Sequence, residues 1–175
     1  MKISYFITEL AITNKVKNIA EKIKDNHPNE KIILLGILKG SFIFMADLVR
    51  KLSENNVEVE VHFINAKSYE GFNTTGNVKL IGDFSFVKNK SVIIVEDIYD
   101  TGLTLKKIIN EILKYKPNSL EVCVLLYKEK LRKNEVKIDY IGFKIPDKFV
   151  VGYGLDYNEK FRGLPFIGIL ETDGD

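Results

Sequence analysis

Three carboxylates lie close together near the middle of this 175-residue chain, between an apolar run and a short polar segment. Glu96, Asp97 and Asp100 follow the apolar residues 91–95, and residues 101–104 read Thr-Gly-Leu-Thr. Backbone N–H groups and hydroxyls at a helix start bind phosphate well, because the helix dipole favours negative charge there. Carboxylates beside such a loop would repel a bare phosphate. The pattern therefore favours a ligand that also carries hydroxyl groups or a cation, as a sugar phosphate with Mg²⁺ does.

A plain structural explanation exists for the same residues. Asp100 or Thr101 could be the N-cap of the following helix, where a side-chain oxygen accepts a hydrogen bond from the first turn. Glu96 and Asp97 could be solvated acids at the end of a strand. Capping requires only one such side chain, and the segment offers several. The density of polar groups therefore favours a binding site, in which Asp100 could also serve as a cap.

The hydrophobic pattern around these residues predicts parallel strands covered by helices. Apolar runs at 91–95 and 120–127 flank a helical pattern at about 102–115, which together form a strand–helix–strand unit. Further strands are predicted at 32–37, 57–64, 78–81, 140–144, 150–153 and 166–170, further helices at about 9–25 and 42–54, and a long loop at 65–78. In α/β folds, ligands bind beyond the carboxyl ends of the strands, where the acidic segment lies.

Composition narrows the class of protein. The chain has 26 Lys and Arg against 24 Asp and Glu, a net charge of +2 that gives little reason to expect a nucleic-acid partner. Its length suits one domain. The single cysteine, Cys123, excludes a disulfide framework and fits a small core residue within an apolar run. No apolar stretch reaches about 18 residues and no signal peptide is evident, so we expect a cytoplasmic protein without a membrane span.

Residues 92–105 resemble the phosphoribosyl-diphosphate (PRPP) motif of type I phosphoribosyltransferases and are most similar to the hypoxanthine-guanine branch of that family. Residues 38–40, Leu-Lys-Gly, are similar to the family's pyrophosphate loop, which often contains a non-proline cis peptide bond. Residues 67–69, Lys-Ser-Tyr, open the long loop at the place of the family's mobile catalytic lid. Residues 145–162 resemble its purine-binding stretch. The resemblance covers most of residues 34–170.

The resemblance implies a fold and a reaction. The expected fold is the type I phosphoribosyltransferase fold, an α/β fold in which helices flank a parallel twisted sheet and a small hood covers the active site. One domain would span residues 1–175, with a core at about 30–140 and a hood from about 1–10 and 140–175. The implied reaction joins PRPP to a 6-oxopurine, namely hypoxanthine, guanine or xanthine, and releases pyrophosphate. A homodimer or homotetramer is expected, as in the family.

For the PRPP side of the site, the resemblance assigns the acidic segment. Glu96 and Asp97 would hold the ribose hydroxyls, directly or through Mg²⁺, and Asp100 would face N7 of the base as general base. Asp100 would also border the 5′-phosphate. The other residues expected to enclose that phosphate are Thr101, Gly102, Leu103 and Thr104.

For the pyrophosphate side, the resemblance assigns residues far apart in the sequence. Lys39 and Gly40 would form the pyrophosphate loop, and Arg162 would pair with the pyrophosphate through its planar fork of donors. Asp156 would bind Mg²⁺ beside the pyrophosphate and border the purine. Without the resemblance, Asp156 and Arg162 could form an ordinary surface ion pair.

For the base, the resemblance assigns three residues of the second half. Lys128 would donate to O6 of the purine, Phe149 would stack on the ring, and the backbone of Val150 would read the base edge. Taken alone, Lys128 could be a solvated lysine and Phe149 a core residue. Ser68 and Tyr69 would belong to the lid.

Two other functions stay open on the sequence. An RNA-binding regulator on the same fold would share the PRPP motif, but Asp100 and residues 148–156 argue against it. A transferase for adenine or orotate is the other alternative, and Lys128 with Phe149 and Val150 favours a 6-oxopurine instead. A Rossmann dehydrogenase is excluded because the chain lacks the G-x-G-x-x-G pattern.

Overall fold

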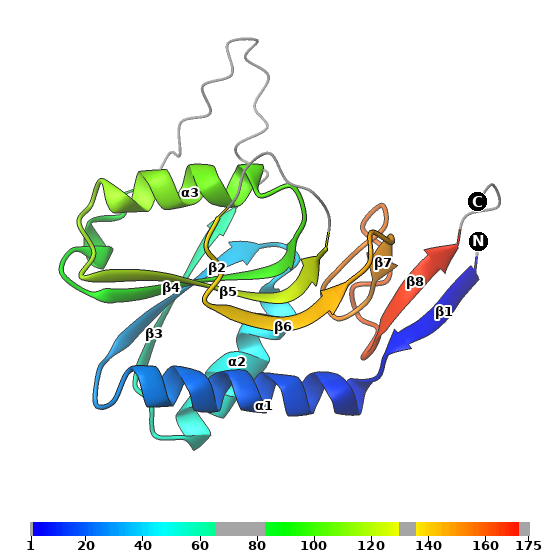
Figure 1. Cartoon of the computed structure of the whole chain (residues 1–175), viewed down its shortest axis with the longest axis horizontal. Helices are drawn as coiled ribbons and strands as arrows, with labels where there is room; N and C mark the ends of the chain where they lie inside the picture. Colours follow the sequence, from blue (N-terminus) through cyan, green and yellow to red (C-terminus); the bar gives the residue numbers. More distant parts are fainter. Residues whose placement is uncertain (1, 66–82, 130–135, 172–175) are drawn as a thin grey trace, which may run out of the picture.

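The computed structural model describes residues 2–65, 83–129 and 136–171, and a parallel five-stranded sheet forms its centre (Figure 1). The strands lie in the order β3-β2-β4-β5-β6. Their bounds are Ile32–Leu38 for β2, Val59–Asn65 for β3, Ser91–Tyr99 for β4, Ser119–Lys128 for β5 and Tyr140–Ile145 for β6. Every neighbouring pair is parallel, so the carboxyl ends of the strands meet at one edge. The predicted α/β class is confirmed.

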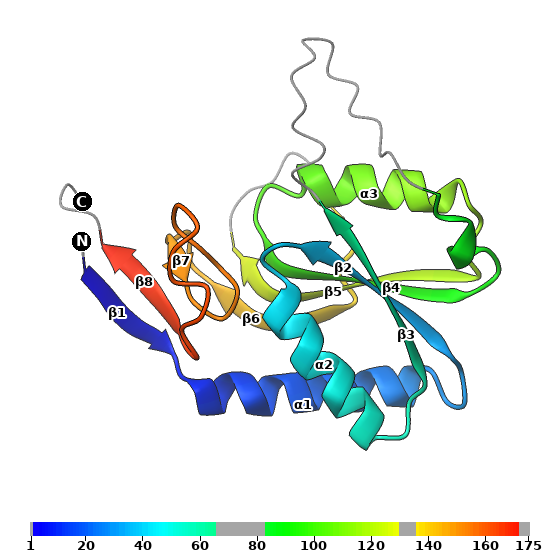
Figure 2. The same ribbon diagram turned by 180° about the vertical axis from the view of Figure 1, so that it is seen from behind.

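Helices cover both faces of this sheet. α1 (Glu9–Asn26) and α2 (Phe42–Glu54) lie on one face, and α3 (Leu103–Leu113) lies on the other (Figures 1 and 2). Alternate residues of β2 are therefore buried against opposite helices, with Leu34 in the core beside α1 and α2 and Leu35 in the core beside α3. This two-sided burial explains why β2 is a continuous apolar run. In the described part of the chain, no helix is both long and apolar enough to cross a membrane.

The boundaries of α1 follow from its own sequence. The helix begins after Thr8, whose hydroxyl accepts a hydrogen bond from the backbone N–H of Ala11 at 3.2 Å. It ends at Asn26, and the N–H of His27 donates to the carbonyl of Ile23 at 3.0 Å. Its buried residues recur at helical spacing. They are Ile12, Val16, Ile19, Ala20 and Ile23. The predicted helix at about 9–25 is confirmed within one residue.

A three-stranded antiparallel sheet forms the expected small hood beside the carboxyl edge of the main sheet (Figure 1). Its order is β1-β8-β7, with bounds Lys2–Ile7 for β1, Ile167–Glu171 for β8 and Val150–Val151 for β7. The two ends of the described chain pair here, for example Ile3 with Leu170. The resemblance implied that residues 1–10 belong to the hood, and the sequence pattern predicted no strand there. Within β1 only Ile7 is buried, and the pairing partner comes from the far end of the chain.

Several predicted boundaries differ from the structure. β4 continues to Tyr99 instead of ending at residue 95, because its ladder with β5 extends to the pair of Tyr99 and Tyr127. β6 pairs with β5, so the main sheet extends past residue 140. β7 is limited to two residues because residues 152–154 have positive φ. The predicted strand at 78–81 and the predicted loop beyond residue 65 lie outside the described residues.

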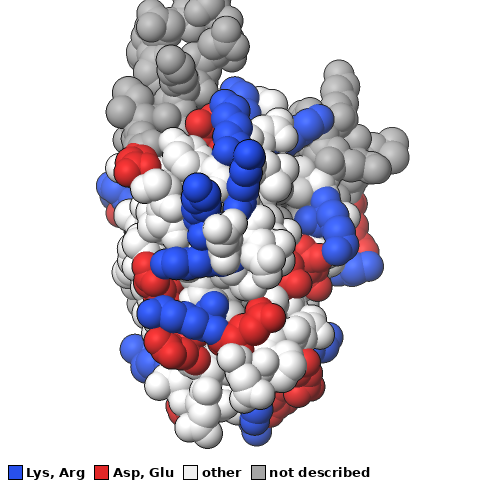
Figure 3. Space-filling view, turned by 90° about the vertical axis from the view of Figure 1, so that its left-hand side faces the viewer, with Lys and Arg blue, Asp and Glu red and all other residues white. Residues whose placement is uncertain are grey.

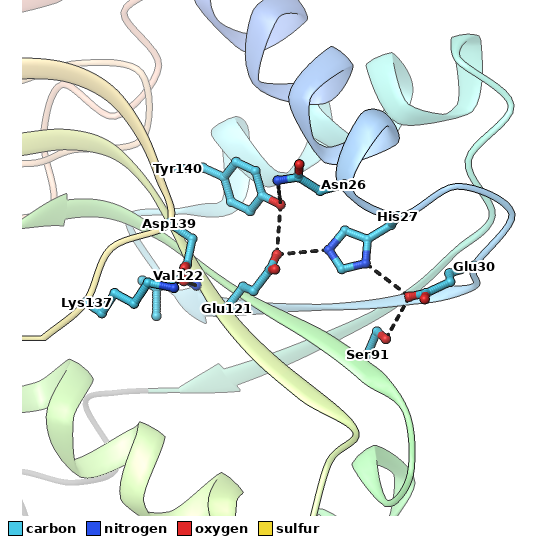
Figure 4. A network of polar contacts seen from close by, with 9 residues as sticks. All are labelled: Asn26, His27, Glu30, Ser91, Glu121, Val122, Lys137, Asp139 and Tyr140. Atoms are coloured by element: carbon cyan, nitrogen blue, oxygen red, sulfur yellow. Dashed lines mark hydrogen bonds and ion pairs between the residues drawn. The ribbon is translucent and has the colours of Figure 1, made fainter.

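Cys123 and His27, which could have carried chemistry, have structural surroundings. Cys123 is fully buried in the sheet, as expected for a core residue. His27 lies at the end of the molecule away from the hood, with Nδ1 3.1 Å from Glu30 and Nε2 2.9 Å from Glu121 (Figure 4). Burial lowers the pKa of His27, but hydrogen bonds and ion pairs with Glu121 and Glu30 outweigh this and raise the pKa above 6.5. His27 thus joins the end of α1 to β5.

Candidate active site

A cavity of about 320 Å³ lies at the carboxyl edge of the main sheet, where β2, β4 and β5 end beside the hood. Its lining contains the predicted base-binding residues together with half of the predicted PRPP-binding residues. The lining residues are Leu38, Lys39, Gly40, Asp97, Ile98, Asp100, Lys128, Phe149, Val150, Leu155, Asp156 and Arg162. Glu96 and residues 101–104 lie next to this set in the sequence but outside it. Ser68 and Tyr69, assigned to the lid, lie outside the described residues.

The β2–α2 loop, residues 39–41, lies close against β4. The peptide bond between Leu38 and Lys39 is cis, in agreement with the resemblance. A Cβ atom at Gly40 would lie only 1.7 Å from Oδ2 of Asp97, so this close approach requires glycine. Ser41 is buried, and its hydroxyl donates to the carbonyl of Ile37 at 2.6 Å. The bond from Ser41 ties the loop to β2, and the close approach of Gly40 to Asp97 places the loop against the acidic end of β4.

The acidic end of β4 carries two adjacent carboxyls with strongly raised pKa values. Burial, with the charge of Asp97, raises the pKa of Glu96 to about 8. Burial also raises the pKa of Asp97 to about 6, although the backbone N–H of Ile98 donates to its Oδ1 at 3.0 Å and the charge of Arg162 opposes the shift. Such raised values mean that the carboxylate forms lack enough positive charge around them. A cation or a hydroxyl donor from a ligand would stabilise the charged forms.

Lys128 ends β5 between two carboxylates. Its Nζ lies 3.0 Å from Oδ1 of Asp147 and 3.5 Å from Oδ2 of Asp100, and the residue is only 9% exposed. The alternative of a solvated lysine is therefore wrong. Sequence reasoning gave Asp147 no role, since its pairing with Lys128 depends on how β6 leads into the hood. An acidic residue just before the predicted base-stacking Phe149 is the signal that could have identified it.

Two cations of the cavity share a carboxylate that sequence reasoning also missed. Oε2 of Glu159 lies 3.2 Å from Nζ of Lys39 and 3.2 Å from Nη2 of Arg162. Arg162 further pairs with Oδ1 of Asp156 at 2.8 Å, and its Nη1 donates to the carbonyl of Gly154 at 2.8 Å. The ion pair of Asp156 with Arg162 does exist, but Arg162 is only 16% exposed in the cavity wall. Glu159 lies between Asp156 and Arg162 in the sequence, and this position could have indicated that it belongs to the site.

The exposed ring of Phe149 gives the cavity a flat apolar surface. Phe149 is 52% exposed, so the alternative of a core residue is wrong. Its ring meets Tyr157 edge-on, with centroids 5.7 Å apart and an interplanar angle of 89°. The next residue, Val150, is buried in β7 and pairs with Ile169 of β8. The hood therefore holds this aromatic ring at the cavity while leaving it accessible.

The start of α3 corrects the capping alternative. The N-cap of α3 is Gly102, which has a φ of 76° and makes no side-chain cap bond. Asp100 is therefore not a helix cap. Thr101 Oγ1 accepts from the N–H of Leu103 at 3.4 Å, a long bond that caps weakly. Thr101, Leu103 and Thr104 are exposed, which leaves this helix start accessible to a ligand.

The chain matches known phosphoribosyltransferases along nearly its whole length. The model of the phosphoribosyl transferase domain family matches residues 7–158. A hypoxanthine phosphoribosyltransferase of Buchnera aphidicola subsp. Schizaphis graminum is 42% identical over 170 residues, or 95% of this chain and 94% of the relative. A hypoxanthine-guanine phosphoribosyltransferase of Staphylococcus aureus is 41% identical over 169 residues, or 95% and 93% of the two chains.

The solved structures agree with these relatives. A crystal structure of a hypoxanthine-guanine phosphoribosyltransferase from Bacillus anthracis is 43% identical and superposes with a TM-score of 0.86, covering 97% of each chain. Fold and cavity define an α/β protein with a ligand site at the carboxyl edge of its sheet. The chain belongs to the phosphoribosyltransferase family. Within that family, it is similar to hypoxanthine and hypoxanthine-guanine enzymes.

Proposed function

We propose that this protein transfers the 5-phosphoribosyl group of PRPP to N9 of hypoxanthine or guanine, forming a nucleoside monophosphate and releasing pyrophosphate. The observation that carries the proposal is a single cavity with two kinds of wall. Lys39 and Arg162 supply positive charge to one part, and the exposed ring of Phe149 with the buried Lys128 forms another. A sugar diphosphate and a flat polar base together require both.

Lys128 is the residue that would select a 6-oxopurine. A lysine ammonium group has three donors and no acceptor, so it can bond to a carbonyl O6 but not to an amino group there. Asp147 and Asp100 hold its Nζ at 3.0 and 3.5 Å, which limits where the donor can point. Phe149 would stack on the base, the backbone of Val150 would contact the base edge, and Asp156 would border it. This arrangement supports hypoxanthine or guanine over adenine.

Asp100 would act as the general base. During transfer, the bond from C1′ to a pyrophosphate oxygen breaks, the bond from N9 to C1′ forms, and the N7 proton of the purine passes to Asp100. Charge develops on the leaving pyrophosphate while C1′ gains oxocarbenium character. Lys39 and Arg162, which share Glu159 in the structure, would exchange that carboxylate for the pyrophosphate. The cavity wall would also keep water away from C1′.

The remaining PRPP contacts follow the acidic end of β4. Glu96 and Asp97 would accept hydrogen bonds from the ribose hydroxyls, and such bonds would stabilise their carboxylate forms. The backbone at Gly40 would contact the pyrophosphate. The start of α3 would bind the 5′-phosphate, since its N–H groups and helix dipole favour an anion. The residues proposed to enclose that phosphate are Asp100, Thr101, Gly102, Leu103 and Thr104.

The donor set fits Mg²⁺ that arrives with the substrate. Mg²⁺ prefers oxygen ligands and usually takes one or two carboxylates together with substrate phosphates. Asp97 and Asp156 line the cavity, and burial raises the pKa of Asp97, as a missing positive charge would. Across the described residues, no group of three or more His, Cys, Asp or Glu is arranged to hold an ion by itself. Asp97, Asp156 and Glu96 would therefore complete the shell of an ion that neutralises the pyrophosphate.

We also propose the wider setting that the resemblance implies. The enzyme would work in the cytoplasm as a homodimer or homotetramer, and Ser68 and Tyr69 would close over the bound substrates. Size-exclusion chromatography with light scattering at several protein concentrations would measure the assembly. A species of 20.0 kDa at all of them would contradict it.

The alternative of an RNA-binding regulator finds little support on the surface. The face seen in Figure 3 carries several Lys and Arg side chains together in its upper half and intermixes them with Asp and Glu in its lower half, so no continuous basic patch of described residues, which RNA binding favours, spans this face. Lysines at the starts of two strands are paired, Lys31 with Glu58 at 3.2 Å and Lys90 with Glu60 at 3.3 Å.

Turnover of four bases tests the proposed function. The purified protein is assayed with PRPP and Mg²⁺ against hypoxanthine, guanine, xanthine and adenine, and kcat/KM is compared. We expect at least one 6-oxopurine to exceed adenine by about 10²-fold or more, because a site built to hydrogen-bond a group rejects an analogue lacking it. A preference for adenine, or salt-sensitive RNA binding without any turnover, would contradict the proposal.

A further inference from the structure

Tyr153 of the β7–β8 loop (residues 152–166) has a conformation that its surroundings must hold. Its φ is 51°, in the left-handed region that large side chains rarely adopt. The residue is 5% exposed, its N–H donates to the carbonyl of Leu164 at 2.8 Å, and its hydroxyl donates to Oδ2 of Asp47 at 2.5 Å. Burial and the carboxylate of Asp47 raise the pKa of Tyr153, so the phenol keeps its proton and remains a donor.

The residue after Tyr153 contacts both sides of the pyrophosphate site. The N–H of Gly154 donates to the carbonyl of Arg162 at 2.9 Å, and Nη1 of Arg162 donates to the carbonyl of Gly154 at 2.8 Å. A Cβ atom at Gly154 would lie 2.1 Å from the carbonyl oxygen of Gly40. Gly154 therefore lies in direct contact with the β2–α2 loop while it orients the side chain of Arg162.

Asp47 belongs to the helix that follows the β2–α2 loop. α2 begins at Phe42, directly after that loop, and Asp47 lies one to two turns into it. Asp47 also forms an ion pair with Arg50 on the same helix. The hydrogen bond from Tyr153 thus joins α2 to the β7–β8 loop, at a site 106 residues away in the sequence. Neither Asp47 nor Tyr153 lines the cavity.

We propose that the Tyr153–Asp47 hydrogen bond is a positioning contact that holds Arg162 against the β2–α2 loop and so sets the affinity for the pyrophosphate group. This inference rests on the proposed function, which assigns Lys39, Gly40 and Arg162 to that group. When the bond is present, the contact between Gly154 and Gly40 is fixed. The distance between the β2–α2 loop, which carries Lys39, and the β7–β8 loop, which carries Arg162, is then constant. When it is lost, the β7–β8 loop can move relative to α2, and Arg162 moves with it.

The test compares Tyr153→Phe with wild type for binding of inorganic pyrophosphate and for steady-state kinetics. In titration calorimetry with pyrophosphate and MgCl₂, we expect Tyr153→Phe to bind about tenfold more weakly, because small displacements of a positioning element have large effects. KM for PRPP should rise to a similar extent. KM for the base should change by less than about twofold, since β8 holds β7 independently of Tyr153.

A second tyrosine provides a matched control. Tyr140 is 3% exposed, and its hydroxyl donates to Oε2 of Glu121 at 2.8 Å and accepts from Asn26 at 2.9 Å (Figure 4). Like Tyr153 it is a buried phenol bonded to a carboxylate, but it lies in the cluster around His27, away from the cavity. Tyr140→Phe should lower the melting temperature about as much as Tyr153→Phe and leave pyrophosphate affinity unchanged.

Substitutions at Asp47 separate the hydrogen bond from the fold. Asp47→Ala should weaken pyrophosphate binding as Tyr153→Phe does. Because both substitutions remove the same hydrogen bond, the double variant should bind pyrophosphate no more weakly than the single variant with the lower affinity. Asp47→Asn keeps an accepting oxygen and should restore most of the affinity. Arg50→Ala removes only the ion pair and should leave the affinity unchanged. If Tyr153→Phe fails to fold, the comparison of Asp47→Ala with Asp47→Asn still decides the question.

The outcomes distinguish this inference from the proposed function. Arg162→Gln should weaken pyrophosphate binding whether or not the Tyr153–Asp47 hydrogen bond positions Arg162. If Arg162→Gln has no effect, the assignment of the pyrophosphate site is wrong. If Arg162→Gln weakens binding but Tyr153→Phe lowers only the melting temperature, or Tyr140→Phe weakens binding equally, the positioning role is overturned and the site remains.

Discussion

Replacing Asp100 tests the proposed general base, because the structure separates its effect on stability from its effect on rate. The N-cap of α3 is Gly102, so neither Asp100→Asn nor Asp100→Ala removes a cap. The contact of Oδ2 with Lys128 is 3.5 Å long and the Asp100 side chain is 42% exposed. Lys128 is buried, but it keeps its ion pair with Asp147 in either variant. Losing the long contact with Asp100 should therefore cost about 0.2–1 kcal/mol, which corresponds to at most about 2–4 °C in melting temperature for a domain of this size.

The expected effect on rate is larger. General base catalysis typically accelerates a reaction by about 10²- to 10⁴-fold, so losing the base raises the activation barrier by about 3–5 kcal/mol. Asp100→Asn keeps the size of the side chain but cannot accept a proton at neutral pH. We therefore expect kcat to fall by at least about tenfold, with a smaller change in the KM for PRPP, and we expect Asp100→Ala to behave similarly.

The assay combines thermal denaturation, steady-state kinetics and a single-turnover measurement. The last is needed because slow product release can hide a defect in the chemical step. A capping role would instead give near-normal turnover for Asp100→Asn and a stability loss of about 0.5–2 kcal/mol for Asp100→Ala. An unimpaired single-turnover rate in Asp100→Asn would refute the reasoning and remove Asp100 from the catalytic residues.

The other predictions concern the metal, the base, the β2–α2 loop and the buried histidine. Excess EDTA should abolish turnover and MgCl₂ should restore it, because the carboxylate-rich site requires a cation beside an anionic donor; full turnover in EDTA would contradict this. Lys128→Ala should raise the KM for hypoxanthine and guanine while PRPP binding, measured by calorimetry, stays intact; the reverse pattern would show that Lys128 serves PRPP. Gly40→Ala should weaken PRPP binding about tenfold or more, since its Cβ would lie 1.7 Å from Oδ2 of Asp97 and the loop must shift; an unchanged KM for PRPP would place the pyrophosphate elsewhere. The pKa of His27 is raised above 6.5 in the folded state, so its stabilising effect should be complete below about pH 6.5 and decline as the pH rises through the folded-state pKa. The difference in melting temperature between wild type and His27→Gln should therefore shrink between about pH 6 and pH 9, and a constant difference would show that the charge of His27 does not stabilise the fold.

The fold was predictable where burial leaves a local pattern in the sequence. β2, β4 and β5 lie inside the sheet with helices on both faces, so each contains a continuous apolar run. The extension of β4 to Tyr99 left no such pattern, because acidic residues interrupt the run and the strand is completed by its ladder with β5. β1 was equally hidden, since it is mostly exposed and pairs with β8 from the far end of the chain.

The candidate site was predictable to the extent that its residues belong to recognisable stretches at strand ends. Parallel topology then brings Lys39, Asp97 and Lys128 to one edge. Two of the carboxylates that pair with the cations of the cavity, Asp147 and Glu159, were not predicted, since their pairing depends on backbone conformations that spacing does not encode. Glu159 has a φ of 62° within a loop of left-handed residues, and only that turn brings its carboxylate to Lys39 and Arg162.

The carboxylates paired with Arg162 and Lys128 affect how the cavity binds a charged substrate. Arg162 is 16% exposed and Lys128 only 9%, and removing an unpaired charge this far from water is unfavourable. Glu159 and Asp156 balance Arg162, and Asp147 and Asp100 balance Lys128, so these cations are held in place before a ligand arrives. An incoming anion then meets donors that are already oriented. It binds only if its interactions with these cations are stronger than the ion pairs with carboxylates that it replaces. The spacing of the cationic elements, which the Tyr153–Asp47 bond is proposed to set, therefore matters as much as their charge.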